Sequence, residues 1–116
     1  MQSNELKDLV LEALEDIKGE DIVCLDVTGQ TDVADYMIVA SGKTNRQVKA
    51  LANNVAEKAR EAGIRPLGVE GLETSEWVLL DLTDVLLHVM LPKAREFYDL
   101  ERLWSMRPDQ HEGANE

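Results

Sequence analysis

The chain has 116 residues and a mass of 13.0 kDa, which suffices for one domain with a single core and leaves no room for two. Hydrophobic residues make up 44% of it and charged residues 30%, the balance of an ordinary globular protein. The lone Cys24 excludes an intramolecular disulfide framework. No apolar run approaches the length of a bilayer and no basic, apolar leader opens the chain, so we expect a cytoplasmic protein without a membrane partner.

The charge of the chain is strongly acidic. It has 23 acidic and 12 basic residues, a formal net charge of −11. Binding to a nucleic-acid backbone depends on Lys and Arg that neutralise phosphates, so this balance argues against a nucleic-acid partner and suits a basic protein partner. Acidity that merely keeps the protein soluble is the alternative, and charge alone leaves both open.

The first forty residues predict a helix followed by two strands. Ser3 or Asn4 can cap the helix and Gly19 ends it. Short apolar runs predict strands at 21–27 and 36–40. The helix carries its apolar residues at spacings of three and four, which makes one packing stripe: Leu6, Leu9, Val10, Ala13, Leu14 and Ile17.

The middle of the chain predicts its longest helix, at 45–62, and a short strand at 67–70. Gly63 stands where a helix commonly stops. The strand, helix and strand from residue 36 to residue 70 are long enough for a right-handed crossover that sets the two strands parallel. The expected buried stripe of the helix consists of Val48, Leu51, Ala52, Val55, Ala56 and Ala59.

Two Val- and Leu-rich runs, 77–82 and 85–91, predict a β-hairpin joined by Thr83-Asp84. A two-residue connection places Leu82 opposite Val85, and the same register pairs Leu80 with Leu87 and Val78 with Val89. Because residues directly opposite share a face, this face is wholly aliphatic and indicates core.

The other face of the hairpin, which we call the mixed face, combines an aromatic ring, a carboxylate, an imidazole and a thioether. It can lie under a helix, with its polar groups satisfied at the edge, or it can be an open sheet face used for binding. Side chains alternate along a strand, so its members are Trp77, Leu79 and Asp81 from the first run and Leu86, His88 and Met90 from the second.

Pro92 stands at a favourable position for the start of a last helix. The domain is expected to span residues 1–104, and residues 105–116 to form a disordered acidic tail. The predicted fold class is α/β, with a small mixed sheet of about five strands packed with helices. The packing stripe of the last helix is Ala94, Phe97, Leu100, Leu103 and Trp104.

The sequence Gly42-Lys43-Thr44 between a strand and a helix resembles part of a phosphate-binding loop. The full pattern requires a further glycine where Met37 stands. Without that glycine, capping of the helix by Thr44 or Asn45 explains the same residues more simply.

We identify no catalytic set, no metal site and no cofactor site. Asp81 belongs to a strand face and Asp84 to the turn, so their spacing does not imply that they converge on one ion. His88 and His111 are the only histidines, and neither a metal-ligand set nor a partnered nucleophile accompanies them. Trp77 is the most informative residue, because tryptophan is enriched both in cores and at binding hot spots.

The segments DYMIVASGKTNRQVKALA (35–52) and GVEGLETSEWVLLDLTDVLLHVM (68–90), followed by REFYDLERLW, closely resemble the ribosomal silencing factor family, also called the Iojap family. The resemblance implies a translation repressor that is not an enzyme. Such a protein binds the large ribosomal subunit through that subunit's fourteenth protein and blocks joining of the small subunit under nutrient limitation. The resemblance also implies a fold similar to that of nucleotidyltransferases.

The resemblance places an aromatic and acidic patch on the mixed face, and the partner-binding residues that we expect are Trp77, Leu79, Asp81, His88 and Met90. It thereby favours the open face over the covered one. Thr83 is a departure, since relatives commonly have glycine there, and this puts the turn type in doubt because glycine tolerates a positive φ far better.

Two competing readings stay open at this point. The first is a surviving metal-dependent nucleotidyltransferase that uses Asp35, Asp81 or Asp84. The chain lacks the Gly-Ser and the Asp-x-Asp pair that such catalysis requires, since Lys43 follows Gly42. The second is a homodimer that buries the Trp77 face between its subunits, so that one face serves both partners in turn.

Overall fold

A computed structural model describes residues 1–98 of the chain, with side chains up to residue 95. The expected α/β class with a five-stranded mixed sheet is confirmed. The elements, in chain order, are α1 (Ser3–Asp16), β1 (Glu20–Asp26), β2 (Tyr36–Ser41), α2 (Asn45–Glu61), β3 (Gly68–Glu70), β4 (Trp77–Asp81), β5 (Val85–Met90) and α3 (Pro92–Tyr98).

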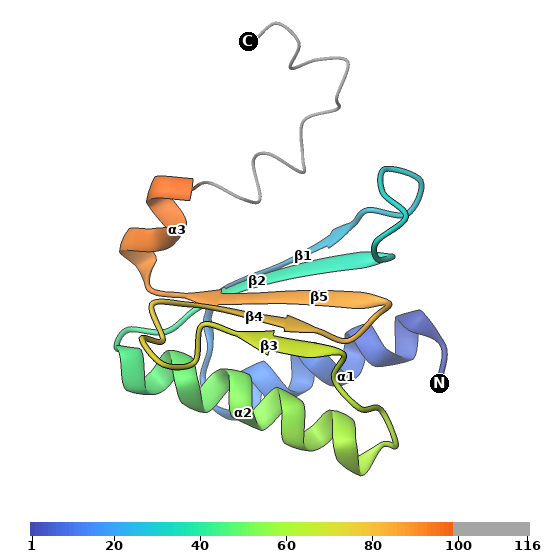
Figure 1. Ribbon diagram of the computed structural model, residues 1–116, viewed down its shortest axis with the longest axis horizontal. Helices are drawn as coiled ribbons and strands as arrows, with labels where there is room; N and C mark the ends of the chain where they lie inside the picture. The colour runs from blue at the N-terminus through green and yellow to red at the C-terminus, as the bar shows by residue number, and fades with distance from the viewer. Residues whose placement is uncertain (99–116) are drawn as a thin grey trace, which may run out of the picture.

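The strands lie in the order β1-β2-β5-β4-β3 (Figure 1). Among the strands within residues 1–98, only β2 and β5 pair in parallel, and the three other pairings are antiparallel. Because β3 opposes β4, and β4 opposes β5, β3 runs in the same direction as β2. The crossover through α2 therefore joins two parallel strands, as expected, and β5 and β4 lie between them.

The register of the hairpin is the one that the sequence predicts. Val78 pairs with Val89 and Leu80 with Leu87, and the N–H of Leu82 donates to the carbonyl of Val85 at 3.0 Å. Helices α1 and α2 lie together on one side of the sheet, and α3 lies on the other side near the end of β5 (Figure 1). The two helices cover the aliphatic face.

The core lies between this sheet face and the two helices. All six α2 residues of the predicted stripe are buried, as are four of the six in α1, namely Leu6, Val10, Ala13 and Leu14. They pack against Ile38, Ala40, Val78, Leu80, Leu87 and Val89. Each fully buried Val or Leu contributes about 1.5–3 kcal/mol, so this layer supplies most of the driving force for folding. Cys24 packs at its edge, where burial raises the pKa of the thiol.

The ends of α1 differ in detail from the expectation, since its N-cap precedes Ser3 and its last residue is Asp16, three residues before Gly19. The N-cap is Gln2 rather than Ser3 or Asn4, and its N–H donates to the carboxylate of Glu5 at 2.8 Å. At the other end Lys18, with φ 60°, takes the left-handed position, and the N–H of Gly19 donates to the carbonyl of Leu14 at 2.8 Å. This 6→1 hydrogen bond belongs to the Schellman motif, which terminates helices.

The start of α2 accounts for the residues that resemble a phosphate-binding loop. The hydroxyl of Thr44 accepts the N–H of Gln47 at 3.1 Å, so Thr44 caps the helix. A Cβ at Gly42 would crowd the backbone nitrogen of Val48 at 2.9 Å, so the glycine allows the chain to pack against the first turn of α2. The ammonium of Lys43 pairs with the carboxylate of Glu20 at 3.3 Å.

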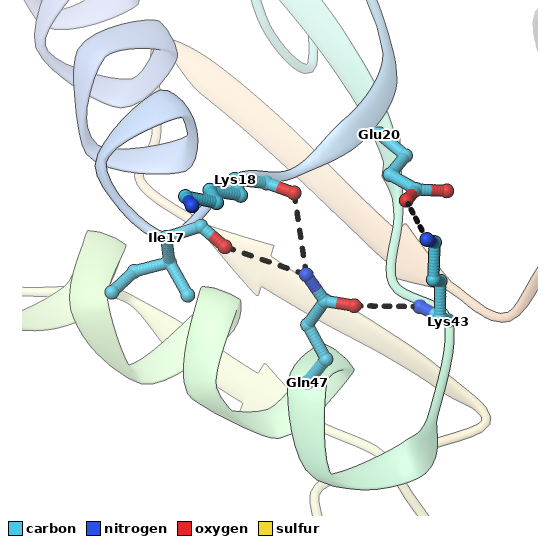
Figure 2. Close-up of polar contacts among 5 residues, drawn as sticks. All are labelled: Ile17, Lys18, Glu20, Lys43 and Gln47. Carbon is cyan, nitrogen blue, oxygen red and sulfur yellow. Dashed lines mark hydrogen bonds and ion pairs between the residues drawn. The ribbon is translucent and has the colours of Figure 1, made fainter.

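Gln47 ties this junction to the end of α1 (Figure 2). Its side-chain carbonyl accepts the N–H of Lys43 at 2.8 Å, and its amide donates to the carbonyl oxygens of Ile17 at 3.4 Å and Lys18 at 3.2 Å. One side chain thereby satisfies backbone groups from both chain segments, which fixes α1 beside α2.

The turn of the hairpin is strained at Thr83. Its φ is 73°, and the N–H of Asp84 donates to the carbonyl of Leu82 at 2.9 Å, which together mark a γ-turn of the rare positive-φ type. The carboxylate of Asp81 accepts the N–H of Thr83 at 2.9 Å, and the carbonyl of Asp84 accepts the N–H of Asp35 at 2.9 Å. These bonds hold Thr83, a β-branched residue, in a backbone conformation that glycine adopts far more easily.

Several expectations fall outside the described residues: the side chain of Phe97, the positions of Leu100, Leu103 and Trp104, and the acidic tail at 105–116. Ala94 lies within them and packs against the apolar cluster of the mixed face. Among residues 1–98, no helix has both the length and the apolar character that crossing a bilayer requires.

Replacing Thr83 with glycine is expected to stabilise the protein. A left-handed conformation costs a residue with a Cβ about 1–2 kcal/mol, which the substitution removes. The extra freedom of glycine in the unfolded chain lowers this stabilisation by about 0.5–1 kcal/mol. We therefore expect the free energy of unfolding to rise by about 0.5–1 kcal/mol in urea denaturation. Thr74→Gly, at an exposed position with an ordinary φ, is the control and should lose stability. Equal losses in both variants would contradict the strain at Thr83.

Candidate functional site

The mixed face of the hairpin brings together the residues that the sequence singles out. In the register of β4 and β5, Leu79 pairs with His88 and Trp77 with Met90, while Asp81 pairs with Leu86. Trp77, Leu79, Asp81 and His88 are all half-buried, in contrast to the fully buried residues that alternate with them. The face is therefore apolar at its centre and partly open to solvent.

Trp77 and His88 form the polar contact at the centre of this face. The indole Nε1–H donates to Nδ1 of the imidazole at 2.9 Å. The two rings are tilted by 45° with centroids 5.7 Å apart. An imidazole nitrogen that accepts a hydrogen bond carries no proton, so His88 is neutral with its proton on Nε2. Burial lowers the pKa of His88 to about 4, which keeps the imidazole neutral at physiological pH.

A hollow of about 300 Å³ opens beside this pair. Its lining combines the Trp77 and His88 rings with Leu79, Gly71 and Glu70. Glu70 reaches the site because β3 pairs with β4 and places Glu70 opposite Leu79. The hollow thus offers an apolar floor with a carboxylate at its edge, which suits a side chain that is apolar along its stem.

Gly71 is required by the close approach of two backbone segments. Its φ is 92°, and a Cβ there would overlap the carbonyl oxygen of Trp77. The loop that follows is held by the N–H of Ser75, which donates to the Gly71 carbonyl at 2.9 Å, and by the hydroxyl of Ser75, which donates to Leu72 at 2.7 Å. Asn45 at the start of α2 also donates to the carbonyl of Thr74, at 2.8 Å.

Met90 differs from the other expected contact residues, because it is 0% exposed. It packs in a second apolar cluster with Val27, Met37 and Val39, and Ala94 of α3 lies against that cluster. The guanidinium of Arg95 donates to the hydroxyl of Ser41 at 3.0 Å, which fixes α3 on this side of the sheet. The mixed face is thus covered by α3 near Met90 and open near β3. The sequence left two alternatives, a face under a helix and an open face, and each describes one part of it.

The carboxylates considered for metal binding lie close to the hairpin turn. Asp81 holds the N–H of Thr83 through its carboxylate, and Asp35 and Asp84 meet through backbone atoms. Within residues 1–98 no group of three or more His, Cys, Asp or Glu side chains is arranged to hold a metal ion. The local task of Asp81 is to fix the turn, and a partner contact through this residue stays a prediction.

Sequence reasoning missed Glu70 and Gly71 as members of this site. Glu70 ends a strand of three residues and Gly71 follows it directly, so no periodicity marks which face they join. The signal that could have found them is Gly71 itself, because a glycine next to a strand can mark a site where another backbone approaches closely.

Comparison with known proteins gives this face its context. The family model described as "Ribosomal silencing factor during starvation" matches residues 1–116. The ribosomal silencing factor RsfS of Chromobacterium violaceum is 55% identical over 104 residues, covering 90% of this chain and 85% of that protein. The chain belongs to the ribosomal silencing factor family. The Haemophilus influenzae RsfS is 40% identical over 100 residues, covering 86% of this chain and 98% of that protein.

Solved structures agree with the fold of this RsfS-family chain. A crystal structure of a Chromobacterium violaceum protein superposes with a TM-score of 0.89 at 53% identity, covering 93% of this chain and 91% of that one. A Bacillus halodurans structure superposes with a TM-score of 0.80 at 38% identity, covering 87% and 94%. The family consists of ribosomal silencing factors that act in starvation, and it is not known for enzymatic activity.

The buried imidazole of His88 predicts a pH dependence of stability. Its pKa is about 4 in the folded chain and ordinarily 6.5, so between these values the unfolded state binds more protons and the free energy of unfolding falls as the pH falls. The loss should reach about 3 kcal/mol by pH 4, since one pKa unit is worth about 1.4 kcal/mol. Urea denaturation at several pH values measures it. In His88→Phe this component should be absent while other groups titrate as before; equal pH slopes would contradict the assignment.

Replacing Gly71 with alanine tests the backbone approach behind the hollow. We expect a loss of about 3 kcal/mol or more in the free energy of unfolding, because the new Cβ overlaps the Trp77 carbonyl and because alanine must adopt a positive φ. Gly29→Ala is the matched control, since Gly29 has φ 85° with nothing within 4 Å of a Cβ. It should lose only about 1 kcal/mol, and a similar loss in both variants would refute the close approach.

Proposed function

We propose that this chain represses translation in the cytoplasm under nutrient limitation by binding the large ribosomal subunit through that subunit's fourteenth protein. Bound there, it sterically blocks joining of the small subunit. Membership of the ribosomal silencing factor family supports the class of function. The mixed face, with Trp77 beside a hollow, is the observation that supports a protein-binding mechanism.

The anatomy of the mixed face matches that of a protein-binding hot spot. Trp77 and Leu79 provide a half-buried apolar centre, and the carboxylates of Glu70 and Asp81 flank it on β3 and at the end of β4. Hot spots combine a large aromatic residue with surroundings that exclude water, and charged residues gather at the rim. Leu79 and His88 continue the surface, whereas Met90 supports it from within the fold.

Charge supports a basic partner for this face. The net charge of −11 attracts a basic ribosomal protein over a distance and speeds encounter. At contact, a carboxylate such as that of Asp81 can accept a charge-assisted hydrogen bond from Lys or Arg of the partner. Attraction and apolar contact thus act at the same surface.

The arrangement of the layers explains how binding becomes obstruction. Helices α1 and α2 lie on the side of the sheet away from the mixed face (Figure 1). When the mixed face rests on the large subunit, both helices project outward into the space that the small subunit needs. A mouse relative, 27% identical over 103 residues and named "Mitochondrial assembly of ribosomal large subunit protein 1", adds support for a large-subunit partner, although this chain covers only 45% of that protein.

Co-sedimentation with purified large subunits tests the proposal. Trp77→Ala should weaken binding about thirtyfold or more, since truncating a central tryptophan costs about 2 kcal/mol. Asp81→Asn should weaken it less, because asparagine keeps the oxygen that accepts the Thr83 N–H. Asp16→Asn, at an exposed residue of α1 on the other side of the sheet, is the matched control and should bind as wild type does.

Each variant is first shown to be folded by circular dichroism. Failure of the wild-type chain to sediment with large subunits would contradict the function. Binding by Trp77→Ala as tight as that of wild type would leave the function standing and show that the mixed face is not its surface.

A further inference from the structure

The half-exposed position of Trp77 raises the question of what holds its ring. A tryptophan at the end of a strand can rotate about two side-chain torsions, and a ring that is mobile before binding loses that freedom on binding. Trp77 is the first residue of β4. Its backbone pairs with Met90 of β5, whereas the pairing of β4 with β3 begins only at Leu79. The ring packs against the apolar cluster that contains Met90, and a hydrogen bond at the indole N–H adds an anchor that fixes the orientation of the ring.

His88 is placed to provide that anchor. It lies in β5, which pairs with both β2 and β4, and its backbone stands between Val39 on one side and Leu79 on the other. Its ring is tilted against the indole, and its Nδ1 accepts the Nε1–H of Trp77 at 2.9 Å. The anchor thus comes from a central strand of the sheet, whereas the ring that it holds comes from a strand end.

We infer that His88 is a positioning residue, which fixes the indole of Trp77 in its binding orientation by accepting the Nε1–H, and which so prepares the hollow between Trp77, Leu79 and Gly71 for the partner. This inference rests on the proposed function, because it assigns a role within the same surface. Since the indole N–H is used inside the protein, Trp77 contributes its ring surface to the partner, and its share of affinity comes from packing rather than from a hydrogen bond.

The first experiment observes the free protein and needs no ribosome. The full-length chain, labelled with nitrogen-15, gives two indole N–H signals because it has two tryptophans, and Trp77→Phe identifies that of Trp77. In wild type this signal should be single, displaced by the hydrogen bond and slow to exchange with water. His88→Phe keeps a ring but removes the acceptor, and should shift the signal and speed its exchange. His88→Asn places an oxygen near the position of Nδ1 and should restore the wild-type behaviour.

The second experiment measures affinity for large subunits with the same variants. His88→Phe should bind about fivefold to tenfold more weakly, the loss expected for one side chain that must be ordered on binding. His88→Asn should bind within about twofold of wild type. In a Trp77→Phe background, which has no indole donor, His88→Phe should cause no further loss, a result that a merely structural role of His88 would not produce.

The inference is overturned if the indole signal of Trp77 is unchanged in folded His88→Phe, if His88→Asn behaves as His88→Phe does in both experiments, or if the two substitutions weaken binding independently. A wild-type chain that does not bind large subunits would instead refute the proposed function, and the signal of the indole in the free protein would still decide whether His88 holds the ring.

Discussion

The pairing of β4 with β5 determines the rest of this structure. Its register sets Val78 against Val89 and Leu80 against Leu87, so all four side chains fall on the face that α1 and α2 cover. The same register places Trp77, Leu79 and His88 on the opposite face. A shift by one residue would exchange the two faces and put an imidazole and a carboxylate into the core. The core and the proposed binding surface are therefore fixed by one set of backbone hydrogen bonds.

The turn that closes the hairpin is held in a strained conformation by that same constraint. Thr83 adopts φ 73°, and the carboxylate of Asp81 and the carbonyl of Leu82 hold the N–H groups that follow. Strain of this kind persists where the surrounding structure over-determines the backbone. Asp81 consequently has two tasks in our account, one in the turn and a proposed one toward the partner, and only the first is a matter of local geometry.

In our proposal the two sides of the sheet have different tasks: the helix side holds the main core, and the other side binds the partner. On the helix side, Gln47 joins the end of α1 to the start of α2 (Figure 2). The other side carries α3 near Met90 and leaves the region beside β3 partly open, where the hollow lies. A change at Trp77 is therefore expected to leave the main core intact, which makes Trp77 a suitable residue for testing the proposed surface.

The elements with a clear period were predictable from the sequence. The stripes of α1 and α2 and the alternation of the hairpin specify burial directly, which is why the helices, the hairpin register and the five-stranded sheet agree with expectation. Single-residue backbone effects were not predictable. Lys18 takes the left-handed position beside a glycine that could have taken it. Gln2 rather than Ser3 caps α1, because Gln2 and Glu5 form a capping box that a search for Ser, Thr, Asp or Asn caps overlooks.

The residues that share the mixed face were predictable from the sequence, whereas their contacts were not. Alternation along the strands puts Trp77, Leu79, Asp81 and His88 on one face, but it cannot show that the indole and the imidazole share a hydrogen bond, which depends on side-chain torsions. Nor can it show that Met90 is covered, because that depends on where α3 packs after the last strand. Glu70 joins the site only through the pairing of β3 with β4.

Hydroxyl-radical footprinting of the chain, alone and bound to large subunits, tests most directly whether the mixed face is the binding surface. It reports the solvent exposure of side chains on both sides of the sheet in one experiment. Our account predicts that oxidation of Trp77 and Leu79 falls on binding, while oxidation of Leu9 and Leu11 on α1 does not change. Protection of Leu9 and Leu11 with Trp77 still reactive would contradict it and would place the contact on the helix layer.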